Sequence, residues 1–162
     1  MRIVNLILLI IISIPFSLFG QNNTNMGGPP THSELIGYWK KINFPNDGQL
    51  NKINPWPQKY QWFAFYENGK VQSMMTDEDY DYNSEELATI FKVFSNNQIP
   101  DYKLQGQILT ITNDQIKDYQ ELWGVNLFAT DLNEFIKKGN LVMTLDNGSG
   151  EIVYYRFLTK IE

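Results

Sequence analysis

The stretch KYQWFAFYENGKVQSMMT, which spans residues 59–76, decides the fold. Its two halves are rich in aromatic and apolar residues, and they flank the dipeptide Asn68-Gly69. Asn-Gly between two such runs is the strongest short signal for a β-hairpin, because a type I′ turn needs a positive φ at both central residues. The sequence therefore predicts a hairpin with strands over 59–66 and 70–76.

The two faces of this hairpin are both apolar. A type I′ turn at this position pairs Trp62 with Met75 and Phe63 with Met74. The first face then carries Phe63, Phe65 and Met74, and the second carries Trp62, Tyr66, Val71 and Met75. A face of a sheet that meets water should be polar. We therefore expect both faces to be covered.

A helix over 84–94 is the expected cover of the second face. Asn83 and Glu86 have the spacing of a capping box. An apolar stripe with helical spacing follows, formed by Leu87, Ile90, Phe91 and Phe94. Core packing of this helix on the hairpin is the favoured interpretation. The alternative is that a partner protein uses the stripe formed by Trp62 and Tyr66.

The rest of the chain reads as further strands with turn residues between them. A long loop is expected over 44–58 and a short helical turn over 132–136. Further strands are predicted over 34–42, 102–105, 107–112, 119–128, 141–145 and 151–161. Eight short antiparallel strands with turn residues between them indicate an all-β fold, either a sandwich or a barrel. Of the two we expect an eight-stranded up-and-down barrel with one short helix, over about 84–94, outside it or capping it. Closure into a barrel removes exposed strand edges.

Composition excludes several classes of function. The chain has 162 residues and a formal net charge of -5 with no basic block, which argues against nucleic-acid binding. The absence of Cys excludes disulfides and thiol chemistry, and a single His leaves little room for a catalytic triad or a multi-His metal site. No common catalytic motif is present. We therefore expect no enzyme activity, no catalytic residue, no metal ligand and no cofactor.

Two polar features have plain interpretations. Asp77, Asp79 and Asp81 begin like an EF-hand loop, but Tyr82 and Ala88 stand where that loop needs Gly and Glu. Acids that gather before a helix N-terminus are favoured by the helix dipole. Whether the segment 77–86 binds Ca²⁺ is left open. His32, beside a polar lead, is interpreted as a pendant side chain.

The first twenty residues predict a secretory signal peptide. Residues 1–20 combine Arg2, an apolar run and a small residue at Gly20. An uncleaved anchor is the alternative, although the apolar stretch is short for a membrane span. A flexible lead over 21–32 and a single domain over 33–162 are expected to follow. The protein is thus expected to be exported, to the periplasm or the extracellular space, with no membrane span in the mature chain.

Over residues 33–162 the sequence resembles the lipocalin-like (calycin) secreted bacterial β-barrels. The resemblance is carried by Gly37-Tyr38-Trp39, by Phe65 before Asn68-Gly69, by Tyr102-x-Leu104 with Leu109-x-Ile111, and by Leu141, Tyr154-Tyr155 and Lys160-Ile161. It implies that Trp39, with Gly37 beside it, closes one end of the barrel. It also implies that a cation of the last strand, Arg156 or preferably Lys160, lies over the indole ring.

A barrel of this size either fills itself with side chains or holds one small ligand. The residues expected to face its interior and to contact a ligand are Phe63, Phe65, Met74, Tyr102, Leu104, Trp123, Val125 and Tyr155. Trp56, between two prolines, either anchors its loop on the barrel mouth or stands out as a recognition element, and anchoring is favoured. The function expected is binding of a small hydrophobic molecule. The alternative is a protein-binding module, an inhibitor or accessory factor, whose outer aromatics contact a protein partner.

Overall fold

The computed structural model describes residues 26–45, 47–94 and 99–162. The predicted signal peptide and residues 21–25 lie outside these ranges. The helical elements are α1 (His32–Leu35), the 3₁₀ helix η2 (Asp47–Leu50) and α2 (Ser84–Phe94). The strands are β1 (Met26–Gly28), β2 (Gly37–Lys41), β3 (Tyr60–Phe65), β4 (Val71–Thr76), β5 (Asp101–Gln105), β6 (Ile108–Thr112), β7 (Gln120–Phe128), β8 (Leu141–Asp146) and β9 (Ile152–Ile161). No helix in the described ranges has the length and apolar character needed to cross a membrane.

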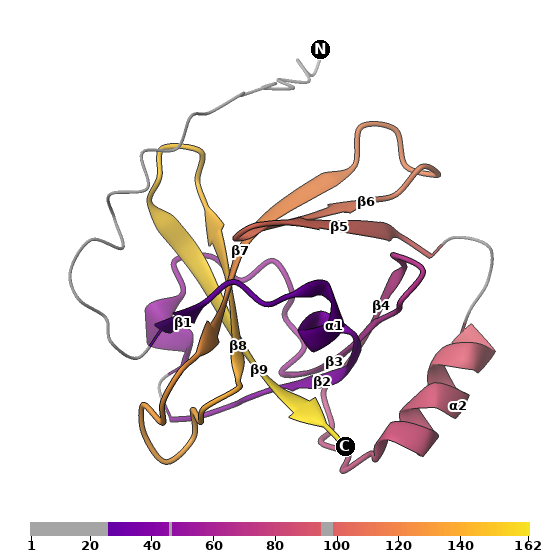
Figure 1. The fold of residues 1–162 in the computed structure, drawn as a ribbon, viewed down its shortest axis with the longest axis horizontal. Helices are drawn as coiled ribbons and strands as arrows, with labels where there is room; N and C mark the ends of the chain where they lie inside the picture. The colour runs from indigo at the N-terminus through magenta and orange to yellow at the C-terminus, as the bar shows by residue number, and fades with distance from the viewer. Residues whose placement is uncertain (1–25, 46, 95–98) are drawn as a thin grey trace.

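The strands form one antiparallel sheet that curls into a half-barrel. Its order is β4-β3-β2-β9-β8-β7-β6-β5, and β1 adds to β7. Figure 1 shows the two ends of this sheet, β3–β4 and β5–β6, facing each other across the interior, with α2 beside β4. The predicted all-β antiparallel fold with one short helix is therefore confirmed.

The concave side of the sheet holds the main core. Side chains alternate between the two faces of a strand, so every second residue points inward. The inner cluster consists of Leu35, Trp39, Phe63, Phe65, Val71, Tyr102, Leu109, Trp123, Val125, Leu141, Met143, Tyr154 and Leu158. Residues of β2 to β9 contribute to this cluster. Burial of their apolar surface stabilises the curled shape of the sheet.

The convex side is covered in two places. Helix α2 packs Leu87 and Phe91 against Trp62 and Ala64 of β3, and Trp62 is 0% exposed. The predicted bounds of this helix and its place on the hairpin are confirmed. The capping box is confirmed as well: the Asn83 N–H donates to the Glu86 side chain, and the Glu86 N–H donates to the Asn83 side chain, both at 3.0 Å. A third cluster, formed by Phe128, Ile136 and Val142, covers β7 to β9.

The predicted register of the β3–β4 hairpin is wrong by one residue. The Tyr66 N–H donates to the Lys70 carbonyl at 2.9 Å, and only Gly69 has a positive φ in this turn. This is a three-residue loop with a bulge at the glycine, the other common use of a hairpin glycine. Phe65 therefore pairs with Val71, and Trp62 with Met74. The shift turns Val71 and Met75 inward and places Met74 with the outer cluster under α2.

Three local predictions also need correction. Residues 32–35, partly inside the strand expected over 34–42, form α1, because Thr31 and Glu34 make a capping box. Residues 26–28 of the expected flexible lead pair with β7 as β1. The helical turn expected over 132–136 is a bent loop, in which Asn133 accepts the N–H groups of Phe135 and Ile136, both at 2.8 Å.

Candidate ligand-binding site

Trp39 of β2 lies in the buried inner core, next to α1 and β9. Its indole N–H donates to the Leu35 carbonyl at 2.8 Å, and the ring is 1% exposed. Lys160 lies over the ring at 5.4 Å and donates to the Glu34 carbonyl at 2.8 Å. Gly37 has a φ of 122°, and a Cβ there would lie 3.1 Å from the Lys160 side chain. The expected placement of Lys160 over Trp39 is therefore confirmed, and Gly37 leaves room for it.

Arg156, the other cation considered for Trp39, lies over different rings. Its guanidinium lies within the half-barrel, surrounded by four aromatic rings. The guanidinium carbon is 4.4 Å from the Trp56 ring centroid, 4.6 Å from those of Phe63 and Trp123, and 5.5 Å from that of Tyr154. We call these four residues the aromatic cage. Each distance lies within the ~6 Å over which a cation is attracted to a ring face.

The alternation of β9 places Arg156 in the cage. Tyr154, Arg156 and Leu158 are buried and point inward, whereas Tyr155 packs with the third cluster on the outer face. The prediction that Tyr155 faces the interior is thus wrong. The residue that follows Tyr155 takes the inward position, because neighbouring side chains of a strand point to opposite faces.

The Arg156 guanidinium is buried, and two of its three nitrogens lack a hydrogen-bond partner among the described residues. The side chain is 3% exposed, and neither Nε nor Nη2 has a hydrogen-bond partner. Burial lowers the pKa of Arg156 to about 10, an effect that nearby Tyr154, Glu121 and Tyr119 partly offset. The group therefore remains cationic at neutral pH, with two donors unsatisfied.

Glu121 is a second charged group near the cage, and its acceptors are already in use. The Trp123 indole N–H donates to Glu121 Oε2 at 2.9 Å, and the Tyr119 hydroxyl donates to Oε1. Burial, with the neighbouring Glu121, raises the pKa of Tyr119, so this phenol stays a donor. The bond from the Trp123 indole fixes the orientation of the ring over which Arg156 lies.

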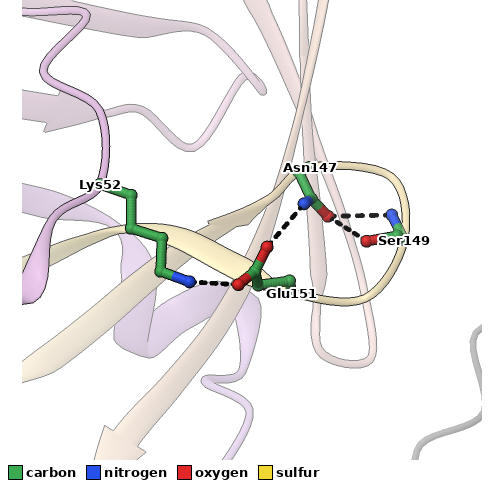
Figure 2. Close-up of polar contacts among 4 residues, drawn as sticks. All are labelled: Lys52, Asn147, Ser149 and Glu151. Carbon is green, nitrogen blue, oxygen red and sulfur yellow. Dashed lines mark hydrogen bonds and ion pairs between the residues drawn. The ribbon is translucent and has the colours of Figure 1, made fainter.

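Trp56 reaches the cage from a loop that is fastened to β9. The Lys52 N–H donates to the Val153 carbonyl at 2.9 Å, and the Tyr155 N–H donates to the Asn51 side chain at 2.7 Å. Figure 2 shows the ion pair between Lys52 and Glu151, which lowers the pKa of that carboxyl group. The Trp56 ring stacks on the Trp123 ring, with the ring centroids 5.3 Å apart.

The turn between β8 and β9 supports the same attachment. Glu151 accepts from the Asn147 amide at 2.9 Å, and Asn147 in turn accepts from the Ser149 hydroxyl at 2.6 Å (Figure 2). The turn thus holds the Glu151 carboxylate where Lys52 meets it. The expectation that Trp56 anchors its loop is confirmed, since its ring packs against the inner core.

A cavity of about 420 Å³ adjoins the aromatic cage. Its lining residues come from the inner face of the sheet, from both faces of the edge strand β4 and from α2. Arg156, Glu121 and Tyr119 supply polar groups to its wall. The apolar lining comprises Trp56, Phe63, Phe65, Val71, Met74, Met75, Phe91, Phe94, Ile99, Pro100, Ile111 and Met143. Gln72 and Ser73 complete the wall.

The predicted interior residues are only partly brought together at this cavity. Six of the eight belong to the inner core or pack against it, namely Phe63, Phe65, Tyr102, Leu104, Trp123 and Val125. Of these, Phe63 and Phe65 line the cavity, and Trp123 contributes to the cage. Met74 borders the cavity from the outer side of β4.

Sequence reasoning missed Glu121, Tyr119 and the partnership of Arg156 with Trp56. One signal could have placed Arg156 inside. It stands in the apolar strand IVYYRFLTKI, residues 152–161, two positions from both Tyr154 and Leu158, so its side chain points to the same inner face as theirs. No sequence pattern joins it to Trp56, which lies in a distant loop.

The other polar features serve structural roles. Asp79 forms an ion pair with Lys40 at 2.9 Å, and Glu86 caps α2. Within the described part of the chain no group of three or more His, Asp or Glu side chains is placed to hold a metal ion. His32 lies in α1 and stacks on Tyr102, with ring centroids 5.7 Å apart, instead of hanging free.

Neither a protein-family model, nor a curated protein, nor a solved structure matches this chain. The relationship to the lipocalin-like barrels therefore stays a prediction from the sequence. The function rests on the geometry of the cavity and the cage.

Proposed function

We propose that this protein binds one small, largely apolar molecule in the cavity beside the aromatic cage. The observation that carries the proposal is the cavity itself, about 420 Å³ in volume and walled mainly by aromatic and aliphatic side chains. Ligand pockets commonly have volumes of roughly 300–1,000 Å³ with a few placed polar groups. If residues 1–20 act as the signal peptide expected from the sequence, the protein binds this molecule after export.

The burial of the outer aromatics favours this function over a protein-docking module. Trp62 is 0% exposed beneath α2, and Trp56 packs inward on the cage. Aromatic anchors of a protein interface must be available to the partner. These two side chains instead contribute to the fold and to the wall of the cavity.

Binding is tested with a neutral fluorescent probe, N-phenyl-1-naphthylamine, titrated into the purified protein. We expect saturable enhancement of fluorescence with one site. Ser73 lines the cavity from β4, so Ser73→Trp fills it and should weaken the probe affinity by about tenfold or more. Gln105→Trp adds the same ring at an exposed position of β5 and should change the affinity by less than about twofold.

Two results would contradict the proposal. One is the absence of saturable binding by the wild-type protein. The other is an equal probe affinity of Ser73→Trp and Gln105→Trp, which would place the probe elsewhere. Circular dichroism of both variants shows whether each retains the wild-type fold.

A further inference from the structure

Arg156 differs from the lysines that make ion pairs in this structure. Those lysines keep between 22% and 58% of the side chain exposed, and each reaches a carboxylate. The pairs are Lys40 with Asp79, Lys52 with Glu151, Lys70 with Asp101, and Lys137 with Asp131. Arg156 is 3% exposed, and two of its nitrogens have no acceptor. A buried donor without a partner is unfavourable, so a cation placed in this way needs a reason.

The aromatic cage leaves Nε and Nη2 of Arg156 without an acceptor. Ring faces attract the positive charge of a guanidinium, but they do not accept its N–H groups as an oxygen does. The N–H groups of a guanidinium lie in its plane and form a fork that matches the two oxygens of a carboxylate. The cage thus orients Arg156 and leaves its donors available, and Arg156 also lines the cavity.

The charges around the cavity limit the ligand to a single negative charge. Glu121 lines the same cavity and brings one carboxylate to the one cation there. It does not form an ion pair with Arg156, and its oxygens already accept from Trp123 and Tyr119. A doubly charged group such as a phosphate monoester would be repelled by this carboxylate, whereas a monoanion leaves the site with only one net negative charge.

We propose that the ligand is an apolar monocarboxylic acid whose carboxylate receives the free N–H groups of Arg156. Its hydrocarbon part would occupy the apolar wall formed by β3, β4 and β6. This assignment rests on the proposed function, and it adds the chemical class of the ligand and the residue that recognises it.

The test compares two ligands of equal chain length, decanoic acid and 1-decanol, as competitors of N-phenyl-1-naphthylamine at pH 7.5. The acid is ionised at this pH. We expect decanoate to displace the probe from the wild-type protein at a concentration about tenfold or more below that of decanol, because a charge-assisted pair forms only with the acid.

Two variants locate this preference. Arg156→Met puts an apolar side chain of similar length in place of the guanidinium, so we expect the preference for decanoate over decanol to fall from about tenfold to about onefold. Glu121→Gln keeps an acceptor for Trp123 and removes the nearby negative charge. It should raise the preference for decanoate over decanol severalfold.

The outcomes separate the two proposals. If decanoate and decanol compete equally with the wild type, or if the preference for decanoate survives Arg156→Met, the carboxylate assignment is wrong while cavity binding stands. If the probe does not bind the wild type at all, the proposed function itself fails. Circular dichroism and saturable binding of N-phenyl-1-naphthylamine by Arg156→Met show whether that variant is folded with an open cavity.

Discussion

At the scale of single residues, Arg156 shows a conflict between stability and recognition. Desolvation of a cation is unfavourable, and ring faces compensate only part of it. Unpaired donors on Nε and Nη2 add to this disadvantage in the free protein. Conflicts of this kind are typical of functional sites, because a side chain selected for stability alone would be apolar here.

Replacing Arg156 by Met should therefore stabilise the unliganded protein. We expect Arg156→Met to raise the free energy of unfolding by about 1–3 kcal/mol, as seen when buried charged groups give way to apolar ones. Urea denaturation followed by circular dichroism measures the change. Lys103→Met, at an exposed position of β5, is the control and should change stability by less than about 0.5 kcal/mol. A less stable Arg156→Met would mean that cation–π attraction in the cage outweighs desolvation.

At the scale of elements, local patterns predicted which segments form strands and helices better than how they pair. The capping residues and apolar spacing of 84–94 specify a helix whose bounds the structure reproduces. The Asn68-Gly69 signal located the hairpin but not its register, because both common glycine-containing turns fit that dipeptide. One residue of slip exchanges the two faces of β4, so Met74 was expected on the wrong side.

Long-range contacts set the remaining limits of prediction at this scale. The inward position of Arg156 follows from alternation within β9, a local property of the sequence. Its contact with Trp56 depends on a loop that Lys52 fixes to Glu151, the residue directly before β9, across 99 positions of the chain. A pattern read in short windows holds no information on such a contact.

The capping box of α2 offers a test of how the outer cover is held. Asn83→Ala removes the acceptor of the Glu86 N–H, and we expect the free energy of unfolding to fall by about 1 kcal/mol. Asn83→Ser supplies an equivalent cap and should restore most of that loss. Urea denaturation of the two variants and the wild type provides the comparison. If alanine and serine destabilise equally, the side-chain cap does not contribute to the stability of the helix.

At the scale of the whole molecule, the half-barrel is closed along only a short seam between its edge strands, β4 and β5. In the described chain the seam has two backbone hydrogen bonds, from Val71 to the Pro100 carbonyl at 3.0 Å and from Tyr102 to the Gly69 carbonyl at 2.7 Å. Lys70 and Asp101 lie opposite each other between these two bonds, as an isolated antiparallel β-bridge. Their side chains form an ion pair at 2.8 Å. An ion pair at the surface adds little stability, so the seam is a weak part of the fold.

A disulfide across this seam should stabilise the whole protein. The bonds on either side make Lys70 and Asp101 a non-hydrogen-bonded antiparallel pair, for which a Cα separation of about 4.5–5.5 Å suits a disulfide. The natural chain has no Cys, so Lys70→Cys with Asp101→Cys can form one intramolecular bond only. The two positions are 31 residues apart, and closing a loop of this length should raise the free energy of unfolding by about 2–4 kcal/mol.

The reduced form of the same double variant is the control for the lost ion pair. Neither position lines the cavity, so the affinity for N-phenyl-1-naphthylamine should agree between oxidised and reduced protein within about twofold. Val71 and Pro100 belong to the seam and also line the cavity. If the probe enters through the seam, its association, followed by stopped-flow fluorescence, should slow on oxidation. Equal stability of the two forms would show that the edges of the half-barrel do not meet in solution. An unchanged association rate would place the entrance elsewhere, on the side of β4 that faces α2.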